Sequence, residues 1–274
     1  MKKKIIFNCL SLGLMVLVNS CSNSVAEENS PSNAGEKGQL VLNLTASNEF
    51  EPATRAVNEE DYLNTSNYTI QVLDADGKQA AACTGRDVNV PISLTKGSYT
   101  VKAFYGEIGD GASTDRFYVE GTQAVTVEAA KSVSATVNCV AQAAKVRVNF
   151  DNEMRKYLSD YNVAFGGTAA MGTDKTIVWG KDQSSPIYFQ IAEAGENLDY
   201  TINVTCKEDY LLNPQIGATT GSVERSFTVQ RNKSYNINVN LNVTNPGQLE
   251  LTIEIDESTN DKPLTWTVPV EWTK

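Results

Sequence analysis

The residue of this chain best placed for covalent chemistry is Cys21, whose thiol follows the small residue Ser20 at the end of an apolar N-terminal run. Residues 5–18 of that run are predominantly apolar, and three consecutive lysines precede them. A basic start, a short apolar stretch and a small-residue cleavage point are typical of a secretory signal peptide, and the run is too short to span a bilayer. Because the cleavage point precedes a cysteine, as in a bacterial lipobox, we expect a signal peptide over residues 1–20 and a lipid anchor on the Cys21 sulfur.

A second candidate for covalent chemistry is the peptide bond between Arg55 and Ala56. It lies in a polar stretch that also contains Pro52 and the acidic residues Glu59 and Glu60. An arginine in an exposed loop is accessible to trypsin-like proteases. We therefore expect proteolytic processing after Arg55, with an ordinary solvated loop arginine as the alternative.

The composition excludes the most frequent catalytic designs. The chain has no histidine, which removes the commonest general base, the Ser-His-Asp triad and histidine-containing zinc sites. The acidic residues fall mainly in turns and polar stretches, so a carboxylate-pair hydrolase has little support, and we expect neither enzymatic activity nor a cofactor. Beyond the signal peptide, 20 Lys and Arg face 33 Asp and Glu, a net charge of −13 that would repel nucleic acid.

Three cysteines remain beyond Cys21, and they predict no metal or redox site. Cys83, Cys139 and Cys206 are widely spaced and form no Cys-x-x-Cys pair. Cys139 and Cys206 each continue an alternating apolar series, so we expect small buried side chains, with a disulfide between any two of the three as the alternative.

The acidic segment Asp-Ala-Asp-Gly-Lys at residues 74–78 lies between two strand candidates. It is typical of a hairpin turn, in which Asp side chains accept hydrogen bonds from nearby amides and Gly77 adopts a positive φ. It also resembles half of a calcium loop. The glutamate that would complete the coordination is missing, so we expect a turn and no metal site.

The elements that position these groups are strands. Between residues 235 and 243, five apolar residues alternate with four asparagines, and residues 99–105 and 146–150 alternate in the same way. Alternation of period two between closely spaced turns indicates an antiparallel all-β protein. One helix is expected over residues 152–161, capped by Asp151, because Met154, Tyr157, Leu158 and Tyr161 would share one face.

The order of these segments predicts the organisation of the mature chain. Residues 21–37 are poor in apolar residues and are expected to form a disordered, lipid-anchored tether. We expect β-sandwiches over residues 38–141 and 142–244. After an Asn-Pro-Gly break, a C-terminal strand pair is expected over residues 245–274.

The first and last of these modules begin alike. Gly38 and Gly247 are each followed by Gln-Leu and then by apolar residues at every second position. One apolar series is Leu40, Leu42 and Leu44, and the other is Leu249, Leu251 and Ile253. The two strands would fit the same groove, because one face of each carries the same branched series. The alternative is that strand starts after a linker often look like this.

With these motifs in this order, the chain resembles the fimbrillin-like surface lipoproteins of Bacteroidetes, especially the DUF4493 group. The resemblance rests on Cys21, residues 38–44, the Thr-Arg-Ala loop at residues 54–56 and the segments 94–106 and 145–150, and it covers most of the mature chain. It implies two transthyretin-like or Ig-like Greek-key β-sandwich domains in tandem. It also implies a lipid-anchored protein of the outer membrane that faces the cell surface and serves as a structural or adhesive component of a fimbria.

The resemblance further implies a mechanism of assembly. In related pilins a protease cuts after a loop arginine and removes the first strand with its lipid, and a neighbour's C-terminal strand fills the groove. Here this implies cleavage after Arg55, followed by replacement of the Leu40, Leu42 and Leu44 strand by the Leu249, Leu251 and Ile253 strand of another subunit. The partners would be pilin-like subunits or further copies, joined head to tail. Some members of such families are anchors or tips that are never cut or never donate.

The alternative function is that of a lipid-anchored surface glycan-binding protein. Trp179 precedes Gly180 and is expected at an exposed strand end, where it would offer a stacking surface for a host or other glycan ligand. Trp266 and Trp272 share one strand parity with two valines and are more simply buried.

Overall fold

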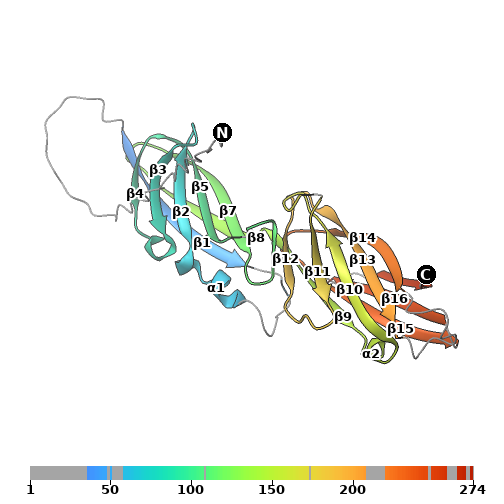
Figure 1. Ribbon diagram of the computed structural model, residues 1–274. Coiled ribbons are helices and arrows are strands. Elements are labelled where there is room, and N and C mark those ends of the chain that lie inside the picture. Colours follow the sequence, from blue (N-terminus) through green and yellow to red (C-terminus); the bar gives the residue numbers. More distant parts are fainter. Residues whose placement is uncertain are drawn as a thin grey trace, which may run out of the picture. The chain divides into compact units, whose positions relative to one another are not determined.

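Strands make up most of the described chain (Figure 1). The structure, a computed structural model, describes residues 36–47, 50, 58–107, 109–172, 174–207, 220–245, 248–257, 264–269 and 272–273. The helices within these ranges are short: α1 (Glu59–Leu63), α2 (Met154–Tyr157) and the 3-10 turns η1 (Thr65–Asn67) and η2 (Gly85–Asp87). No helix of the described part has the length and apolar character needed to cross a membrane. The prediction of an all-β protein is confirmed.

Within the described residues, one sheet of seven strands has the order β3-β2-β5-β7-β8-β1-β4. Its strands are β1 (Lys37–Ser47), β2 (Thr69–Asp74), β3 (Gln79–Thr84), β4 (Ile92–Thr95), β5 (Gly97–Gly106), β7 (Tyr118–Val127) and β8 (Ser132–Ala141). Side chains from β2, β5 and β7 share one apolar cluster with side chains from β1 and β8, so the sheet folds over on itself. We call this cluster the first core.

Two further sheets of the described part pack around a second apolar cluster, the second core. The five-stranded sheet has the order β11-β10-β13-β14-β18, with β10 (Leu158–Gly166), β11 (Thr176–Gly180), β13 (Glu196–Cys206), β14 (Thr220–Val229) and β18 (Trp272–Thr273). The six-stranded sheet has the order β17-β16-β15-β9-β12-β6, with β6 (Ala112–Ser113), β9 (Ala143–Phe150), β12 (Ile187–Gln190), β15 (Ser234–Asn245), β16 (Gln248–Glu257) and β17 (Leu264–Pro269).

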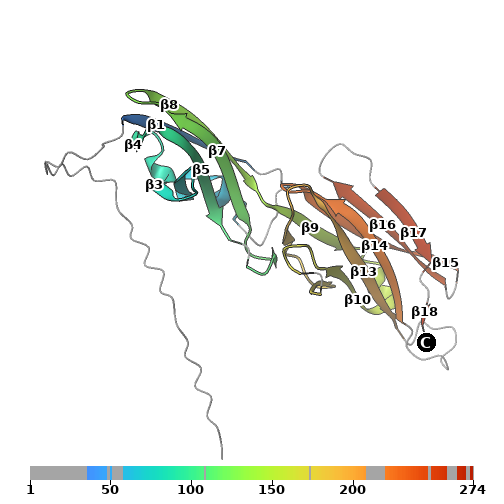
Figure 2. The same cartoon turned by 90° about the horizontal axis from the view of Figure 1, so that it is seen from above.

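Two strand pairs depart from the expected antiparallel arrangement. β1 runs parallel to β8 over nine residue pairs, from Gln39 opposite Ser132 to Ser47 opposite Val140. Figures 1 and 2 show β1, in blue, lying along β8, in green. β9 and β15 are also parallel. The prediction of a purely antiparallel protein is therefore wrong, because alternation reveals which face of a strand is buried and not which strand lies beside it.

The alternating residues fill the two cores as the sequence predicts. In β15, Tyr235, Ile237, Val239 and Leu241 are buried in the second core. The asparagines between them face outward, where Asn238 accepts a hydrogen bond from Asn149 and Asn242 donates one to Thr252. Full burial of each aliphatic side chain of this kind contributes about 1.5–3 kcal/mol to folding.

The predicted helix over residues 152–161 is mostly wrong. Asp151 does cap a turn, since its Oδ1 accepts a hydrogen bond from the Glu153 amide at 3.0 Å, but α2 spans one turn only. Leu158 and Tyr161 belong to β10, and the pairing of β10 with β13 shifts between Leu158 and Asp160. Such a bulge inserts one extra residue, so two inward side chains lie three positions apart, which is also the spacing of a helix face.

The predicted turn at residues 74–78 is confirmed. Asp74 Oδ1 accepts hydrogen bonds from the amides of Asp76 at 3.0 Å and Lys78 at 2.9 Å, and Gly77 has a φ of 77°. The Asp74 carboxylate is thus used within the turn. No cluster of potential metal-binding side chains is found in the described part of the chain.

One buried polar atom contributes no hydrogen bond. The Tyr200 hydroxyl in the second core is buried and has no partner among the described residues, and burial raises its pKa to about 12. Tyr68 in the first core offers a contrast, because its buried hydroxyl donates to the Tyr62 carbonyl oxygen at 2.6 Å. A buried hydroxyl without a partner costs desolvation that no contact offsets.

We therefore expect Tyr200→Phe to leave the free energy of unfolding unchanged or to raise it by up to ~1 kcal/mol, and Tyr68→Phe to lower it by ~1 kcal/mol. Urea unfolding of the two variants checks this. Equal destabilisation by both substitutions would show that the Tyr200 hydroxyl has a partner.

Candidate functional site

The candidate site is the groove that β1 occupies in the first sheet, between β8 and β4. β4 pairs only with the start of β1, from Lys37 to Leu40, whereas β8 follows it from Gln39 to Ser47. Among the described strands, β1 is therefore an interior strand at its N-terminal end and an edge strand beyond Leu40. Its backbone is held at the entrance by the Gln39 amide, which donates to the Lys131 carbonyl at 2.8 Å.

The inner face of β1 is an integral part of the first core. Leu40 and Leu42 are 0% and 2% exposed, and Leu44 packs against the same cluster. In the pairing with β8, these three side chains stand beside Val133, Ala135 and Val137. The leucines expected to form one apolar face do so.

The outer face of β1 is polar and is matched to β8. Asn43 Nδ2 donates to Ser134 Oγ at 3.1 Å, and Thr45 Oγ1 donates to Asn138 Oδ1 at 2.7 Å. These contacts are exposed and add little stability individually. They do fix which residues of the two strands lie side by side.

The expected donor strand lies in a different sheet from the groove. β16 pairs antiparallel with β15 and with β17, and Leu251, Ile253 and Ile255 are buried in the second core. Leu249 lies opposite Val243, and its side chain is outside the described part of the structure. The structure thus brings together Leu40, Leu42 and Leu44, and separately Leu251 and Ile253, but it places no residue of β16 in the groove.

The two residues expected to undergo covalent processing lie outside the described residues. These are Cys21 and Arg55, with Ala56 beside it. The described residues nearest to Arg55 are Phe50 before it and Asn58 after it. The described cysteines Cys83, Cys139 and Cys206 form no disulfide with one another. Burial raises the pKa of the Cys139 thiol to about 12, so it is a poor nucleophile.

The residues on either side of the Arg55 segment meet at a buried ion pair. Glu59 Oε1 lies 2.8 Å from Lys145 Nζ and accepts a hydrogen bond from the Tyr188 hydroxyl at 2.6 Å. The Lys145 side chain is 0% exposed, and its Nζ lies 5.7 Å from the centre of the Phe50 ring. Phe50 also packs against Tyr188, with ring centres 5.7 Å apart. We call these four residues the seam.

The seam joins elements that contribute to both cores. Lys145 is in β9 and Tyr188 is in β12, two strands of the six-stranded sheet, yet Tyr188 belongs to the first core. Burial, followed by the hydrogen bond to Glu59, raises the pKa of the Tyr188 hydroxyl. The sequence analysis missed this group. The available signal was a lysine directly after two alanines at the start of a strand, in the sequence Ala-Ala-Lys-Val-Arg-Val at residues 143–148.

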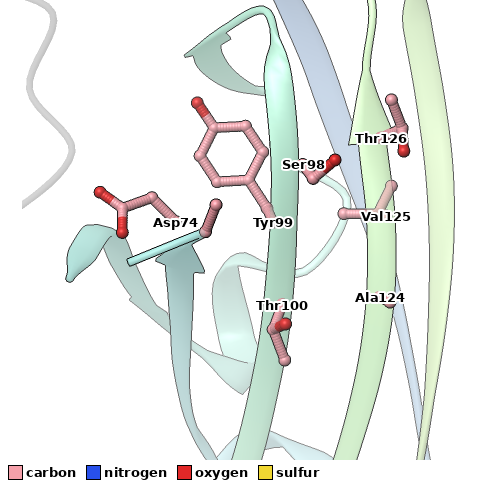
Figure 3. A pocket seen from close by; sticks show the side chains of 8 residues that line it. Asp74, Ser98, Tyr99, Thr100, Ala124, Val125 and Thr126 are labelled. Atoms are coloured by element: carbon pink, nitrogen blue, oxygen red, sulfur yellow. The ribbon is translucent and has the colours of Figure 1, made fainter. Parts of the chain in front are cut away.

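Two surface grooves test the alternative of glycan binding. The first is lined by Asp74, Ser98, Tyr99, Thr100, Val125 and Thr126, among others (Figure 3). Tyr99 is its only aromatic residue, is 7% exposed, and donates its hydroxyl to the Thr95 carbonyl. It therefore presents no open ring face for a sugar to stack on.

The second groove includes Trp179, for which the sequence predicts exposure. That prediction is wrong, because Trp179 is 2% exposed and packs in the second core. In β11 the neighbouring Val178 is the exposed residue, so the strand turns its larger side chain inward. The side chains of Trp266 and Trp272 lie outside the described part. Neither Tyr99 in the first groove nor Trp179 in the second thus offers an open ring face for a glycan.

The seam yields a direct test of its contribution to stability. Glu59→Gln should lower the free energy of unfolding by about 3 kcal/mol or more, because it leaves the buried Lys145 ammonium without its carboxylate. The double variant Glu59→Gln with Lys145→Met should recover much of this loss. Glu60→Gln, at an exposed position of the same helix, is the matched control. Equal stability of Glu59→Gln and Glu60→Gln in chemical unfolding would contradict a contribution from the ion pair.

Comparison with known proteins gives similarity in sequence and in structure. The family model described as "Domain of unknown function (DUF4493)" matches residues 36–270. No protein of curated function matches the chain. Among solved structures, a fimbrial assembly protein from Parabacteroides distasonis is similar, with 11% identity, a TM-score of 0.43, and coverage of 84% of this chain and 98% of that chain.

The fimbrial anchor protein Mfa2 from Porphyromonas gingivalis is also similar. It shows 14% identity, a TM-score of 0.41, and coverage of 85% of this chain and 99% of its own. The match to the family model extends from the residue before β1 to the residue after β17, and so includes the groove and both cores. The chain belongs to the DUF4493 family.

Proposed function

We propose that this chain is a lipid-anchored protein of the outer-membrane surface that serves as a structural or adhesive component of fimbriae, with β1 as an exchangeable strand. The observation that carries the proposal is the place of β1. This strand supplies Leu40 and Leu42 to the first core, yet the chain joins it to the rest of that core only through the segment that contains Arg55.

Cleavage after Arg55 would convert β1 from a covalently attached strand into a separate peptide. Its departure would open an apolar groove beside Val133, Ala135 and Val137 of β8, and it would leave the facing backbone groups of β8 unpaired. A strand from another subunit would restore both the apolar contacts and the hydrogen bonds, which is β-strand addition. A head-to-tail contact of this kind extends into a filament when the rotation between subunits does not close a ring.

β16 is the proposed donor, and its packing in the second core determines the free energy needed to release it. To leave its own sheet it must expose Leu251, Ile253 and Ile255, at about 1.5–3 kcal/mol for each side chain. It regains a similar amount in the groove of the next subunit. The exchange is thus close to balanced in apolar burial. The irreversible loss of the β1 peptide would give it direction.

Strand exchange could be tested by deleting the donor strand or by blocking the cleavage. Deletion of residues 248–274 would also remove three buried residues from the second core, so substitution of Arg55 is the sharper test. In cells that form polymers of this protein, we expect the subunits to begin at Ala56 and Arg55→Ala to abolish the polymer ladder. Arg86→Ala, at an arginine that the structure shows to be exposed, should leave the ladder intact. Unchanged polymers in Arg55→Ala cells, or a native protein that remains a monomer with Cys21 attached, would exclude the cleaved-subunit role.

The lipid anchor has an independent test. Cys21→Ser should abolish incorporation of labelled palmitate into the protein and release it from the membrane fraction, because no other acyl attachment is proposed. Incorporation that persists in the variant would contradict lipidation at Cys21.

A further inference from the structure

The entrance of the β1 groove accepts a residue without a side chain. A Cβ atom at Gly38 would lie 2.1 Å from the Glu128 carbonyl oxygen, 2.8 Å from Val127 Cγ1 and 2.9 Å from the Lys131 carbonyl oxygen. Two of these atoms belong to the backbone of the β7–β8 turn. That turn is tied to β1 by two hydrogen bonds of 2.8 Å, from the Ala130 amide to the Lys37 carbonyl and from the Gln39 amide to the Lys131 carbonyl.

The clash cannot be relieved by rotation of a flexible side chain, because the backbone atoms responsible are held by the turn itself. A strand in this groove must therefore have glycine at its entrance. It must then have large apolar residues two and four positions later, where Leu40 and Leu42 are buried. The groove consequently requires a fixed spacing between the glycine and the large apolar residues, in addition to an apolar face.

The C-terminal segment meets this requirement in one alignment. Gly247 is its only glycine after β15, and Leu249 and Leu251 follow at the required spacing. We infer that Gly38 and its surroundings fix the register of strand exchange, so that Gly247 of a second copy takes the place of Gly38. This inference rests on the proposed function, and it adds which residue of the donor meets which residue of the acceptor.

Other alignments are excluded for stated reasons. A shift of one residue turns the charged face of β16 toward the core. A shift of two residues keeps the apolar face of β16 inward, so only the glycine requirement excludes that register. In one direction Leu249 would collide with the β7–β8 turn, and in the other Gly247 would leave a cavity at the fully buried position of Leu40.

The outer face of β16 also fits β8 in the inferred register. Thr252 would take the place of Asn43 near Ser134, and Glu254 would take that of Thr45 beside Asn138. A hydroxyl can replace the Asn43 amide as a donor, and a carboxylate can accept from the Asn138 amide nitrogen. Ile255 would replace Ala46, which is only partly buried and leaves room for a larger side chain.

Disulfide trapping can measure this register. The acceptor is the full chain with Asn138→Cys and a site for a specific protease in residues 51–57. It is cut with that protease, its N-terminal fragment is removed, and mass spectrometry verifies the removal. The donors are uncut full chains with Thr252→Cys, Glu254→Cys or Asp256→Cys. Because Asn138 pairs with Thr45 in the present sheet, we expect a cross-linked dimer with Glu254→Cys and at least about tenfold less with the other two. An acceptor without Asn138→Cys controls for the native cysteines.

The glycine requirement is tested in the same assay. Adding Gly247→Val to the Glu254→Cys donor should reduce the dimer by about tenfold or more, since it places a branched side chain against fixed backbone atoms. Glu250→Ala in that donor should have little effect, because residue 250 would lie on the outer face. Thermal unfolding confirms that both donors are folded.

The outcomes separate the inference from the proposed function. Trapping through residue 252 or 256 in preference to 254, or equal trapping with Gly247→Val, would overturn the register while leaving strand exchange in place. Failure of all three donors to cross-link to the emptied acceptor would overturn strand exchange itself.

Discussion

The constraint on which this structure depends is that β1 must lie in the first sheet for the first core to be closed. Its inner leucines fill the cluster that β2, β5, β7 and β8 surround, and its backbone is paired with β8 along nearly its whole length. A sheet tolerates the loss of an outer hairpin far better than the loss of a strand that fills its core. Because β1 is also the first of the described strands, a single cut after it can separate it from the strands that follow.

The seam gives that cut a second consequence. Phe50 and Glu59 lie on opposite sides of Arg55 in the sequence, and both contact the buried Lys145 ammonium. Cleavage after Arg55 and departure of the N-terminal fragment would remove Phe50 but keep Glu59. The ion pair would then lose the aromatic ring beside its ammonium group, while both of its charges remain. The link between β9, β12 and the first core would thus weaken without being broken.

The sequence predicts much of the fold and part of the site. Alternation in residues 235–243 and the leucines of β1 predict strands and buried faces correctly, because a half-buried strand leaves a local pattern. Parallel pairing of β1 with β8 leaves none, since the partner is some ninety positions away. The bulge in β10 imitates helix spacing, and Lys145 looks like one polar residue in a strand because its partner Glu59 is equally distant in sequence. Likewise, the glycine at position 38 is visible in the sequence, but its necessity depends on the turn that touches it.

The parallel pairing of β1 with β8 also bears on how the chain reaches its folded state. During synthesis, β1 emerges before the other described strands and must remain unpaired until β8 has followed. Loop closure over such a distance is slow, and the waiting strand presents leucines and an open backbone edge to its surroundings. A chain with this topology is expected to depend on factors that hold it unfolded, and premature pairing between neighbouring nascent chains is most dangerous in the interval before β8 arrives.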